Sequence, residues 1–590
     1  MVSCVSTYWR VAVPPKTSAE LEAEMWLFVL QLPHDRFLAW RCCLFNRWFL
    51  ALLAVLAQMC MGFVYAFNIL SDPIDTLFAD GIPSDANHQV FRSIRVFTVA
   101  TLCIGLTGAI VGPFIERRGP RVGMVTGTLL VVVGIVASQL AVHFKSAALL
   151  YVGFGACVGT GHSLILLASI SAVQKWFPDW RGLVTGAFTG GLGLGSGLWS
   201  MLYKCLMDLD PSSGKQVDHV PMAFLVTGGL SLVILAITTA VIRTPPPSFS
   251  VNGHDMHNIP VHNAPAHGHI HDEYLKVGMT LVNYPSVAQP RTPTAAAIGS
   301  DRHYFQQVQA LTLVQCIFST DFFWLYFGFA ASVLPAVLVL AQGIDILTLT
   351  YRLAFGPVAD FMAHAAVASC IGMFVAPLLS DLLIRIFYAN PAFARKLVLA
   401  GALLVQAVAV PLVGRQLEDK ASASTFAFEW PSYVLCFATG GAFGVTPVLI
   451  TDMFGVYHAG TMYGLVLTSR AITSSIVGFR AAVSSADDVK LQFGIMFVAV
   501  LIGFVMMVFV RTNSMDRFYH GYQLTLFGRV LIQIPFRLRP EADTNDMAIL
   551  APNDSFFLWD KQSQDHHERT SSMQSNPTET RRPPPIRLLY

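Results

Sequence analysis

Long apolar runs separated by short polar stretches dominate this chain. A helix that crosses the roughly 30 Å hydrocarbon core of a bilayer needs about 20 apolar residues, at 1.5 Å per residue. Twelve runs of that length lie between charged residues, and one long polar stretch separates the sixth from the seventh. They are residues 48–71, 96–115, 122–142, 146–174, 182–203, 221–242, 322–344, 361–380, 397–414, 430–451, 459–479 and 491–510. The pattern predicts an all-α membrane protein with twelve transmembrane helices, whereas the apolar stretch 26–32 is too short to span.

The composition narrows the class of protein further. Of the 590 residues, 54% are hydrophobic and 13% are charged, whereas a soluble domain has about 25% charged residues. The formal net charge of +2 gives no reason to expect nucleic-acid binding. The ten cysteines show neither metal-ligand spacing nor the framework of a secreted disulfide protein. These numbers exclude a soluble enzyme, a secreted disulfide module and a mostly disordered chain, and we expect no cofactor and no metal site.

Lysine and arginine predict the orientation in the membrane. Most of the 38 basic residues lie on one side if both termini are cytoplasmic, including Arg117, Arg118 and Arg121 in one short loop and Arg385 and Arg395 in another. Basic residues in short loops favour the cytoplasmic side. We therefore expect both termini in the cytoplasm, and the plasma membrane rather than an organelle membrane. The expected order is a cytoplasmic segment 1–46, a six-helix half 47–243, a cytoplasmic histidine-containing loop 244–320, a second half 321–511, and a largely disordered cytoplasmic tail 512–590.

Two pairs of similar segments indicate an internal repeat. GPFIERRGPR at 112–121 follows the second run, and APLLSDLLIR at 376–385 follows the eighth, with Asp381 in the acidic position. WFPDWRGLVTGAFTGG at 176–191 parallels MFGVYHAGTMYGLVLTS at 453–469. The two runs of six helices are therefore predicted to be pseudo-symmetric halves. In such proteins the substrate site lies near the bilayer midplane between the halves.

The turn at 112–121 resembles the G-x-x-x-[D/E]-R-x-G-x-R signature of the major facilitator superfamily. Other segments are similar to its monocarboxylate transporter and oxalate:formate antiporter branch. In helix one, Q-x-x-x-G-x-x-Y-A is matched from Gln58 to Ala66, and QKWFPDWRGLVTG at 174–186 is close to W-F-P-x-x-R-G-x-A-x-G. The resemblance implies the major facilitator fold and secondary transport of a small organic anion, a mono- or dicarboxylate, by proton coupling or exchange. The implied cytoplasmic gate residues are Gly112, Glu116, Arg117, Gly119, Arg121 and Asp381.

The second half departs from that family pattern in three places. Pro377 replaces the glycine of the turn, and Leu382 replaces the basic residue after the acid. The arginine that family members carry in helix eight is absent, and residues 342–361 form an apparent insertion between helices seven and eight. These departures bear on the carboxylate assignment more than on the fold.

Arg470 is the charged residue that falls inside an apolar run. It is placed near mid-membrane, where an arginine costs about 2.5 to 3.5 kcal/mol on insertion scales. One interpretation is that its guanidinium faces a central cavity and binds a carboxylate bidentately, with Tyr463 and Ser474 on the same helical face. The other is a structural pairing with a residue on a neighbouring helix.

Other polar residues inside the runs are further candidates. Gln58 and Tyr65 lie seven residues apart on one helical face and either line the cavity or bond between helices. His162 and His364 either carry a proton, since histidine titrates near neutral pH, or serve packing. His267, His269 and His271 in the central loop either capture a metal ion or reflect a biased composition.

Two alternatives to organic-anion transport remain open from the sequence. One is a transporter of the same fold for a neutral or cationic solute, with Arg470 structural. The other is a membrane nutrient sensor that binds its ligand without transporting it. A membrane enzyme is disfavoured, because no paired carboxylates, H-E-x-x-H or G-x-S-x-G element lies near a membrane surface. The expected partners are a small-molecule substrate and the lipid bilayer, and an accessory membrane protein is left open.

Overall fold

The described part of the chain forms two separate units. The computed structural model describes residues 8–9, 16–32, 36–79, 93–207, 220–246, 248–259, 301–347, 351, 355–416, 425–481, 486–519, 521–526 and 529–535. The first unit is Met1–Thr512 and the second is Asn513–Tyr590. The histidine cluster at 267–271 and the end of the tail, residues 536–590, lie outside the described residues.

The first half of the first unit contains six spans. The first span is broken at Gly62 into two helices, and the fourth contains a π-helical stretch, η1. The elements are α3 (Arg47–Met61), α4 (Phe63–Ala79), α5 (Ile94–Arg118), α6 (Pro120–His143), α7 (Ala147–Leu150), η1 (Tyr151–Val158), α8 (Gly159–Trp176), α9 (Arg181–Met207) and α10 (Val220–Val241).

The second half repeats this arrangement with six long helices. They are α16 (Thr320–Asp345), α17 (Phe355–Phe387), α18 (Pro391–Gln416), α19 (Thr425–Phe454), α20 (Val456–Ala481) and α21 (Ala486–Phe509). Within the described ranges, ten spans are long and apolar enough to cross a membrane. The remaining two are α9, which is rich in glycine, and α20, which carries Arg470. The prediction of twelve helices in two six-helix halves is confirmed.

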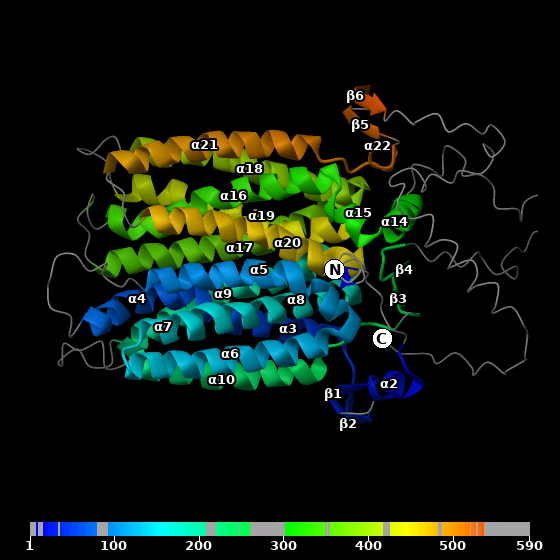
Figure 1. Ribbon diagram of the computed structural model, residues 1–590. Coiled ribbons are helices and arrows are strands. Elements are labelled where there is room, and N and C mark those ends of the chain that lie inside the picture. Colours follow the sequence, from blue (N-terminus) through cyan, green and yellow to red (C-terminus); the bar gives the residue numbers. More distant parts are fainter. Residues whose placement is uncertain are drawn as a thin grey trace, which may run out of the picture. The chain divides into compact units, whose positions relative to one another are not determined.

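The two halves meet along two helix pairs, α5 with α20 and α9 with α17 (Figure 1). Glycine makes this approach possible: a Cβ on Gly464 would lie 2.0 Å from the carbonyl oxygen of Gly108, closer than any side chain can come. At the second pair the approach is less close, with a Cβ on Gly186 at 3.1 Å from the carbonyl oxygen of Phe374. We call the end of the bundle at the 112–121 turn the motif end.

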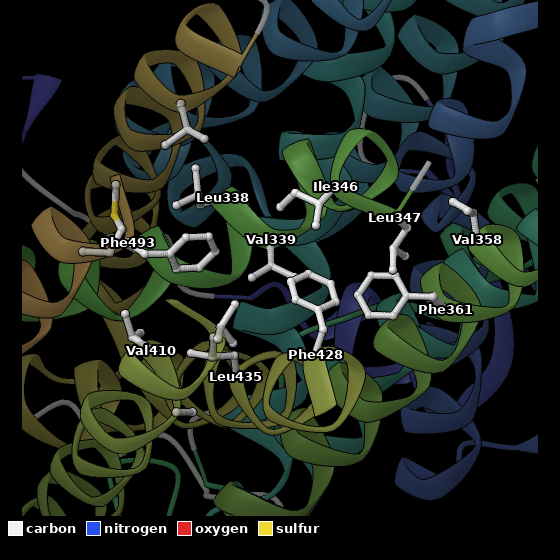
Figure 2. Packing of buried hydrophobic residues seen from close by; sticks show 14 residues of the cluster. Leu338, Val339, Ile346, Leu347, Val358, Phe361, Val410, Phe428, Leu435 and Phe493 are labelled. Carbon is white, nitrogen blue, oxygen red and sulfur yellow. The ribbon is translucent and has the colours of Figure 1, made fainter. Parts of the chain in front are cut away.

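Apolar packing holds the second half together, and the apparent insertion takes part in it. Figure 2 shows aliphatic and aromatic side chains of α16, α17, α18, α19 and α21 in one buried cluster. Ile346 and Leu347, which follow α16, belong to this cluster together with Phe361 and Phe428. The described parts of the segment 342–361 therefore extend the two helices at its ends and add to the core.

Short elements lie outside the long helices. In the first unit they are α2 (Ser18–Ala23), β1 (Trp26–Leu32), β2 (Arg36–Leu44), β3 (Ser250–Val251), β4 (His254–Asp255), α14 (Asp301–Gln309) and α15 (Leu313–Ile317). The second unit contains α22 (Ser514–Arg517), β5 (Gly521–Leu526) and β6 (Arg529–Pro535). The strands form three antiparallel pairs, β1 with β2, β3 with β4 and β5 with β6. The apolar stretch 26–32 is thus a strand.

Candidate functional site

Arg470 contacts the first half of the bundle from its position on α20. Its Nη1 donates a hydrogen bond of 2.8 Å to the hydroxyl oxygen of Tyr65 on α4. Its Cζ lies 4.9 Å from the centroid of the Tyr65 ring and 5.1 Å from that of Phe443 on α19. The guanidinium therefore interacts with aromatic rings from both halves, which stabilises a cation.

A small pocket of about 10 Å³, room for roughly one water molecule, lies beside this guanidinium. Its lining comes from both halves, because Tyr65, Thr101 and Ile104 belong to α4 and α5, whereas Leu467, Arg470 and Ala471 belong to α20. Within the described residues, no carboxylate forms an ion pair with Arg470. The pocket thus combines an interface between the halves with a cation that can bind an anion.

Two further candidates, His162 and Tyr463, are buried polar side chains. His162 on α8 is fully buried and its ring centroid lies 6.0 Å from that of Tyr65. Tyr463 is also buried, and its ring lies 6.3 Å from that of Phe443. In the described part of the chain, both ring nitrogens of His162 and the hydroxyl of Tyr463 are without a hydrogen-bond partner. An unsatisfied buried polar group costs about 1–3 kcal/mol, so such groups call for an explanation by function.

The remaining mid-membrane candidates are less closely connected to Arg470. Gln58 is fully buried on α3, and both polar atoms of its amide are without a partner among the described residues. No hydrogen bond or ring contact between described residues joins it to Arg470. Ser474 is half-buried one turn further along α20. His364 is exposed on α17, and its ring lies 6.0 Å from that of Tyr433.

The predicted gate residues of the first half lie at the motif end. Glu116 is buried and accepts hydrogen bonds of 2.5 Å from Ser171 and from Lys175 on α8. A Cβ on Gly112 would lie 2.2 Å from the hydroxyl of Thr461, so only glycine allows α5 to approach α20 here. Gly119 joins α5 to α6 at a φ of +85°, a conformation that favours glycine.

The two gate arginines contact the N-terminal segment. The Arg117 guanidinium lies 5.1 Å from the centroid of the Tyr8 ring. Arg121 donates a hydrogen bond of 3.0 Å to the carbonyl oxygen of Ile242 and forms an ion pair of 3.3 Å with Glu24. These two side chains therefore attach residues before the first span to the motif end.

Asp381 connects the two halves, whereas the hydrogen bonds of its counterpart Glu116 to Ser171 and Lys175 lie within the first half. The Asp381 carboxylate accepts hydrogen bonds of 3.2 Å and 2.8 Å from the backbone amides of Gly182 and Leu183, at the start of α9. Arg395 on α18 forms an ion pair with the same carboxylate at 3.1 Å. The negative charge also interacts favourably with the N-terminus of α9.

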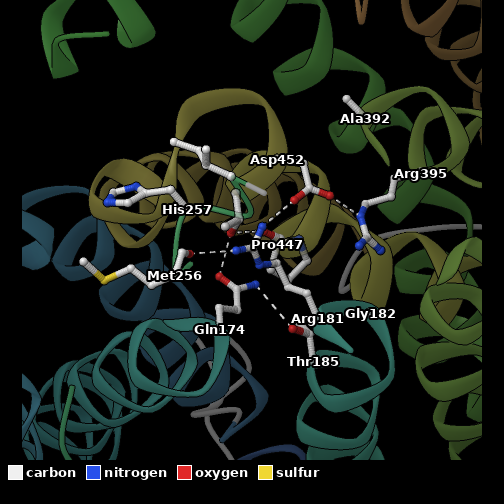
Figure 3. A network of polar contacts seen from close by, with 12 residues as sticks. Gln174, Arg181, Gly182, Thr185, Met256, His257, Ala392, Arg395, Pro447 and Asp452 are labelled. Carbon is white, nitrogen blue, oxygen red and sulfur yellow. Dashed lines mark hydrogen bonds and ion pairs between the residues drawn. The ribbon is translucent and has the colours of Figure 1, made fainter. Parts of the chain in front are cut away.

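A buried ion-pair network at the motif end includes residues that the sequence analysis did not select. Figure 3 shows Asp452 on α19 between Arg181 of the first half and Arg395 of the second. Arg181 lies 2.7 Å from one carboxylate oxygen of Asp452, and Arg395 binds the other. The repeat contained a signal for buried ion pairs in this region. In the two aligned segments, a charged residue stands directly before the first aligned position: Lys175 before Trp176, and Asp452 before Met453.

The beginning of the central loop covers this network. Arg181 donates a hydrogen bond of 3.0 Å to the carbonyl oxygen of Met256 (Figure 3), and the His257 ring lies 5.1 Å from that of Tyr457. Burial lowers the pKa of His257, Asp255 opposes this change, and Arg181 and Lys175 lower it further. The neutral form of His257 is therefore favoured while the loop is docked on this network.

A further buried charge pair lies in the second half. Asp321 at the start of α16 is buried, and its carboxylate forms an ion pair of 3.0 Å with Arg511. The two charges lie where the first and last spans of the second half come together. This pair therefore stabilises the second half rather than the pocket.

Comparisons with known proteins agree with this architecture. The sequence pattern of the Major Facilitator Superfamily matches residues 48–478. The chain is 30% identical over 203 residues to the oxalate:formate antiporter of Oxalobacter formigenes, covering 34% of this chain and 43% of that protein. It is 32% identical over 123 residues to monocarboxylate transporter 14 of Mus musculus, covering 20% of this chain and 23% of that one. The alignments thus span less than half of the length of these curated relatives.

Solved structures share the fold at low sequence identity. The proton:xylose symporter XylE, bound to 6-bromo-6-deoxy-D-glucose, superposes with a TM-score of 0.56 at 13% identity, covering 79% of this chain and 96% of that one. At this identity the similarity concerns the fold alone. By name, the two relatives belong to the branch that the motifs resemble, and the family indicates a transporter and not an enzyme. From its matched helices and its two six-helix halves, the chain belongs to the Major Facilitator Superfamily.

Proposed function

We propose that this protein is a secondary transporter of a small organic anion, a mono- or dicarboxylate, that works by alternating access. The observation that carries the proposal is Arg470, a mid-membrane guanidinium that lines a pocket between the halves and has no carboxylate partner among the described residues. A cation in this position is expensive unless an anion or a functional role compensates it. A substrate carboxylate would accept two parallel hydrogen bonds from the guanidinium.

The surrounding polar groups support the same chemistry. The Tyr65 hydroxyl fixes the guanidinium, and His162 lies beside the Tyr65 ring. In this proposal Tyr65, Gln58, Tyr463 and Ser474 orient the substrate. His162 is the proposed proton site if transport is a symport, and His364, which is exposed on α17, is the second candidate.

The motif end is the proposed cytoplasmic gate. Its closely packed glycines and the Asp381 and Asp452 bonds join the halves on this side of Arg470. We place both termini and the central loop in the cytoplasm and the protein in the plasma membrane, with halves at 47–243 and 321–511. Opening the gate requires that these contacts separate while the halves rotate about the pocket.

Two names among the relatives favour an anionic substrate, namely oxalate:formate antiporter and monocarboxylate transporter 14. The decisive measurement is uptake of labelled short-chain mono- and dicarboxylates into proteoliposomes that contain the full-length protein. Each carboxylate is tested beside its uncharged amide, with and without a pH gradient and with and without carboxylate loaded inside. We expect saturable uptake of the acid only, driven either by the gradient or by exchange.

Substitution of Arg470 separates the anion hypothesis from the alternatives. We expect R470Q to lower kcat/KM for carboxylate about a hundredfold, equivalent to about 3 kcal/mol, and R470K to retain part of the activity. R415Q is the matched control, because Arg415 is exposed at the end of α18. Undiminished uptake by R470Q would contradict the proposal. Saturable flux of the amide would favour a neutral solute, and binding without flux would favour a sensor.

A further inference from the structure

The hairpin formed by β1 and β2 has one face that is apolar and exposed. Cross-strand pairing places Leu30 opposite Leu38 and Phe28 opposite Trp40, with side chains on the same face. The exposed fractions are 49% for Leu30, 58% for Leu38 and 71% for Trp40. Leu44, paired with Trp26, is 70% exposed. A sheet face in water normally carries polar residues, so this face requires another explanation.

The opposite face of the hairpin packs against the protein. Leu27 and Val29 are buried, with β1 lying against the motif end of α10 and against α2. The buried Arg243, just after α10, donates hydrogen bonds of 2.6 Å to the carbonyl oxygen of Glu24 and 2.8 Å to that of Trp26. Its guanidinium also lies 4.5 Å from the centroid of the Phe45 ring. The hairpin is therefore held at a defined depth, where α10 ends and α3 begins.

The position of this face makes the membrane surface its natural partner. The hairpin lies beside the motif end of α10 (Figure 1), and α10 carries exposed aliphatic residues along its length, from Leu225 near its other end through Val233 to Ile237. The side of α10 that carries them faces the hydrocarbon core in a membrane-spanning bundle, so the apolar face of the hairpin lies next to a lipid-covered surface. Tryptophan is enriched at the level of the lipid headgroups, as Trp40 would be here.

The charges on the hairpin agree with this placement. Arg36 and Arg41 are exposed, and no acidic side chain of the described hairpin residues accompanies them on β1 or β2. Arginine side chains near an anionic leaflet are attracted to its surface. Apolar side chains that enter the headgroup region, flanked by basic residues, are the general pattern of interfacial membrane elements.

We propose that the β1–β2 hairpin is a membrane-surface anchor whose apolar face, Leu30, Leu38, Trp40 and Leu44, inserts into the headgroup region of the leaflet at the motif end. The hairpin thereby fixes the start of α3 and the end of α10 relative to the bilayer. This inference is independent of the substrate. It concerns a lipid contact outside the pocket, and it does not require transport activity.

Site-specific photo-crosslinking to lipid tests this anchor on the full-length protein in nanodiscs. A photoreactive amino acid replaces Trp40 in one variant and Leu38 in a second, so that a folding defect in one does not decide the result. The control replaces Asn252, which is exposed at the motif end on the β3–β4 hairpin. Intact-mass spectrometry after irradiation measures the fraction of protein that carries a phospholipid adduct.

We expect the adduct fraction at Trp40 and Leu38 to exceed that at Asn252 at least fivefold in phosphatidylcholine nanodiscs. We also expect it to rise when phosphatidylglycerol is included, because Arg36 and Arg41 attract anionic lipid. Adducts with solvent at all three positions would overturn the proposal. Crosslinks between two copies of the chain at Trp40 would overturn it as well, since they would assign the face to self-association.

Discussion

The buried charges at the motif end and the half-buried charge of Arg470, placed near mid-membrane, differ in how they are neutralised. At the motif end, Lys175 pairs with Glu116, and Asp452 lies between Arg181 and Arg395. Near mid-membrane, Arg470 donates a hydrogen bond to the neutral hydroxyl of Tyr65. Among the described residues, no acidic side chain forms an ion pair with it. The same residue type is thus placed in two opposite electrostatic environments.

This difference teaches which charges are structural and which are available. A paired charge has its desolvation compensated within the protein, and breaking the pair leaves the partner uncompensated. A charge without an acidic partner in the protein can be compensated by an anion from outside. The motif-end pairs therefore stabilise one conformation of the bundle, whereas Arg470 is available for the proposed anionic substrate.

Removing Asp452 should have the largest effect on stability, because two buried arginines lose their shared carboxylate. We expect D452N to lower the free energy of unfolding by about 3–5 kcal/mol, seen as a lower Tm in thermal unfolding of the purified protein. The matched control is E429Q on the same helix, because Glu429 is half-buried and accepts a bond of 3.4 Å from Tyr433. Equal Tm values for D452N and E429Q would show that the network does not hold the closed motif end.

Adding a side chain where the halves touch should strongly reduce transport through steric overlap alone. In G464V the new Cβ would lie 2.0 Å from the Gly108 carbonyl oxygen, so α5 and α20 must separate at the motif end. We expect carboxylate flux in proteoliposomes to fall more than tenfold, without any change in charge. Gly401 on α18 has no atom within 4 Å of an added Cβ. Flux in G401V should therefore remain close to that of the unchanged protein, and equal losses in both variants would contradict this account.

A smaller effect is expected when the ring of Tyr65 stays and its hydroxyl is removed. Y65F keeps the aromatic face under the Arg470 guanidinium but deletes the 2.8 Å hydrogen bond that fixes it. A hydrogen bond to a charged group contributes about 1.5–3 kcal/mol, part of which the substrate replaces, so we expect KM for carboxylate to rise about tenfold. Y433F, outside the pocket, should leave KM unchanged. A KM that is insensitive to Y65F would remove Tyr65 from the site.

Much of the fold follows from local pattern, whereas the pairing of charges does not. The length of each apolar run was enough to place twelve helices, and the repeat at Glu116 and Asp381 indicated two halves. The contact of Tyr65 with Arg470 joins residues 405 positions apart, so it depends on how α4 and α20 pack. Asp452 and Arg395 lie at the ends of apolar runs, where a charged residue is already expected because it orients the chain in the membrane. Their pairing follows from three-dimensional packing that no local pattern encodes.

The smallest expected effect concerns His257, which lies over the motif-end network. Its protonation makes the docking of the central loop on this network depend on pH. Its lowered pKa, caused first by burial and then by Arg181 and Lys175 against the opposing Asp255, means that the docked loop resists protonation. The undocked loop takes up the proton near the ordinary histidine pKa of about 6.5. Docking is therefore at full strength above that pH and weakens as the pH falls toward the lowered value. The change is at most about 1.4 kcal/mol for each unit by which the pKa is lowered.

Hydrogen exchange measures this change directly. After correction for the intrinsic pH dependence of exchange, amides of residues 250–259 should lose protection between about pH 7.5 and about pH 5.5. H257Q should remove that loss, because glutamine does not titrate, whereas H364Q on the exposed face of α17 should keep it. If H257Q lost protection on acidification as the unchanged protein does, a different group would control the loop. Protection that is independent of pH in both proteins would show that the paired charges hold the motif end closed without help from the loop.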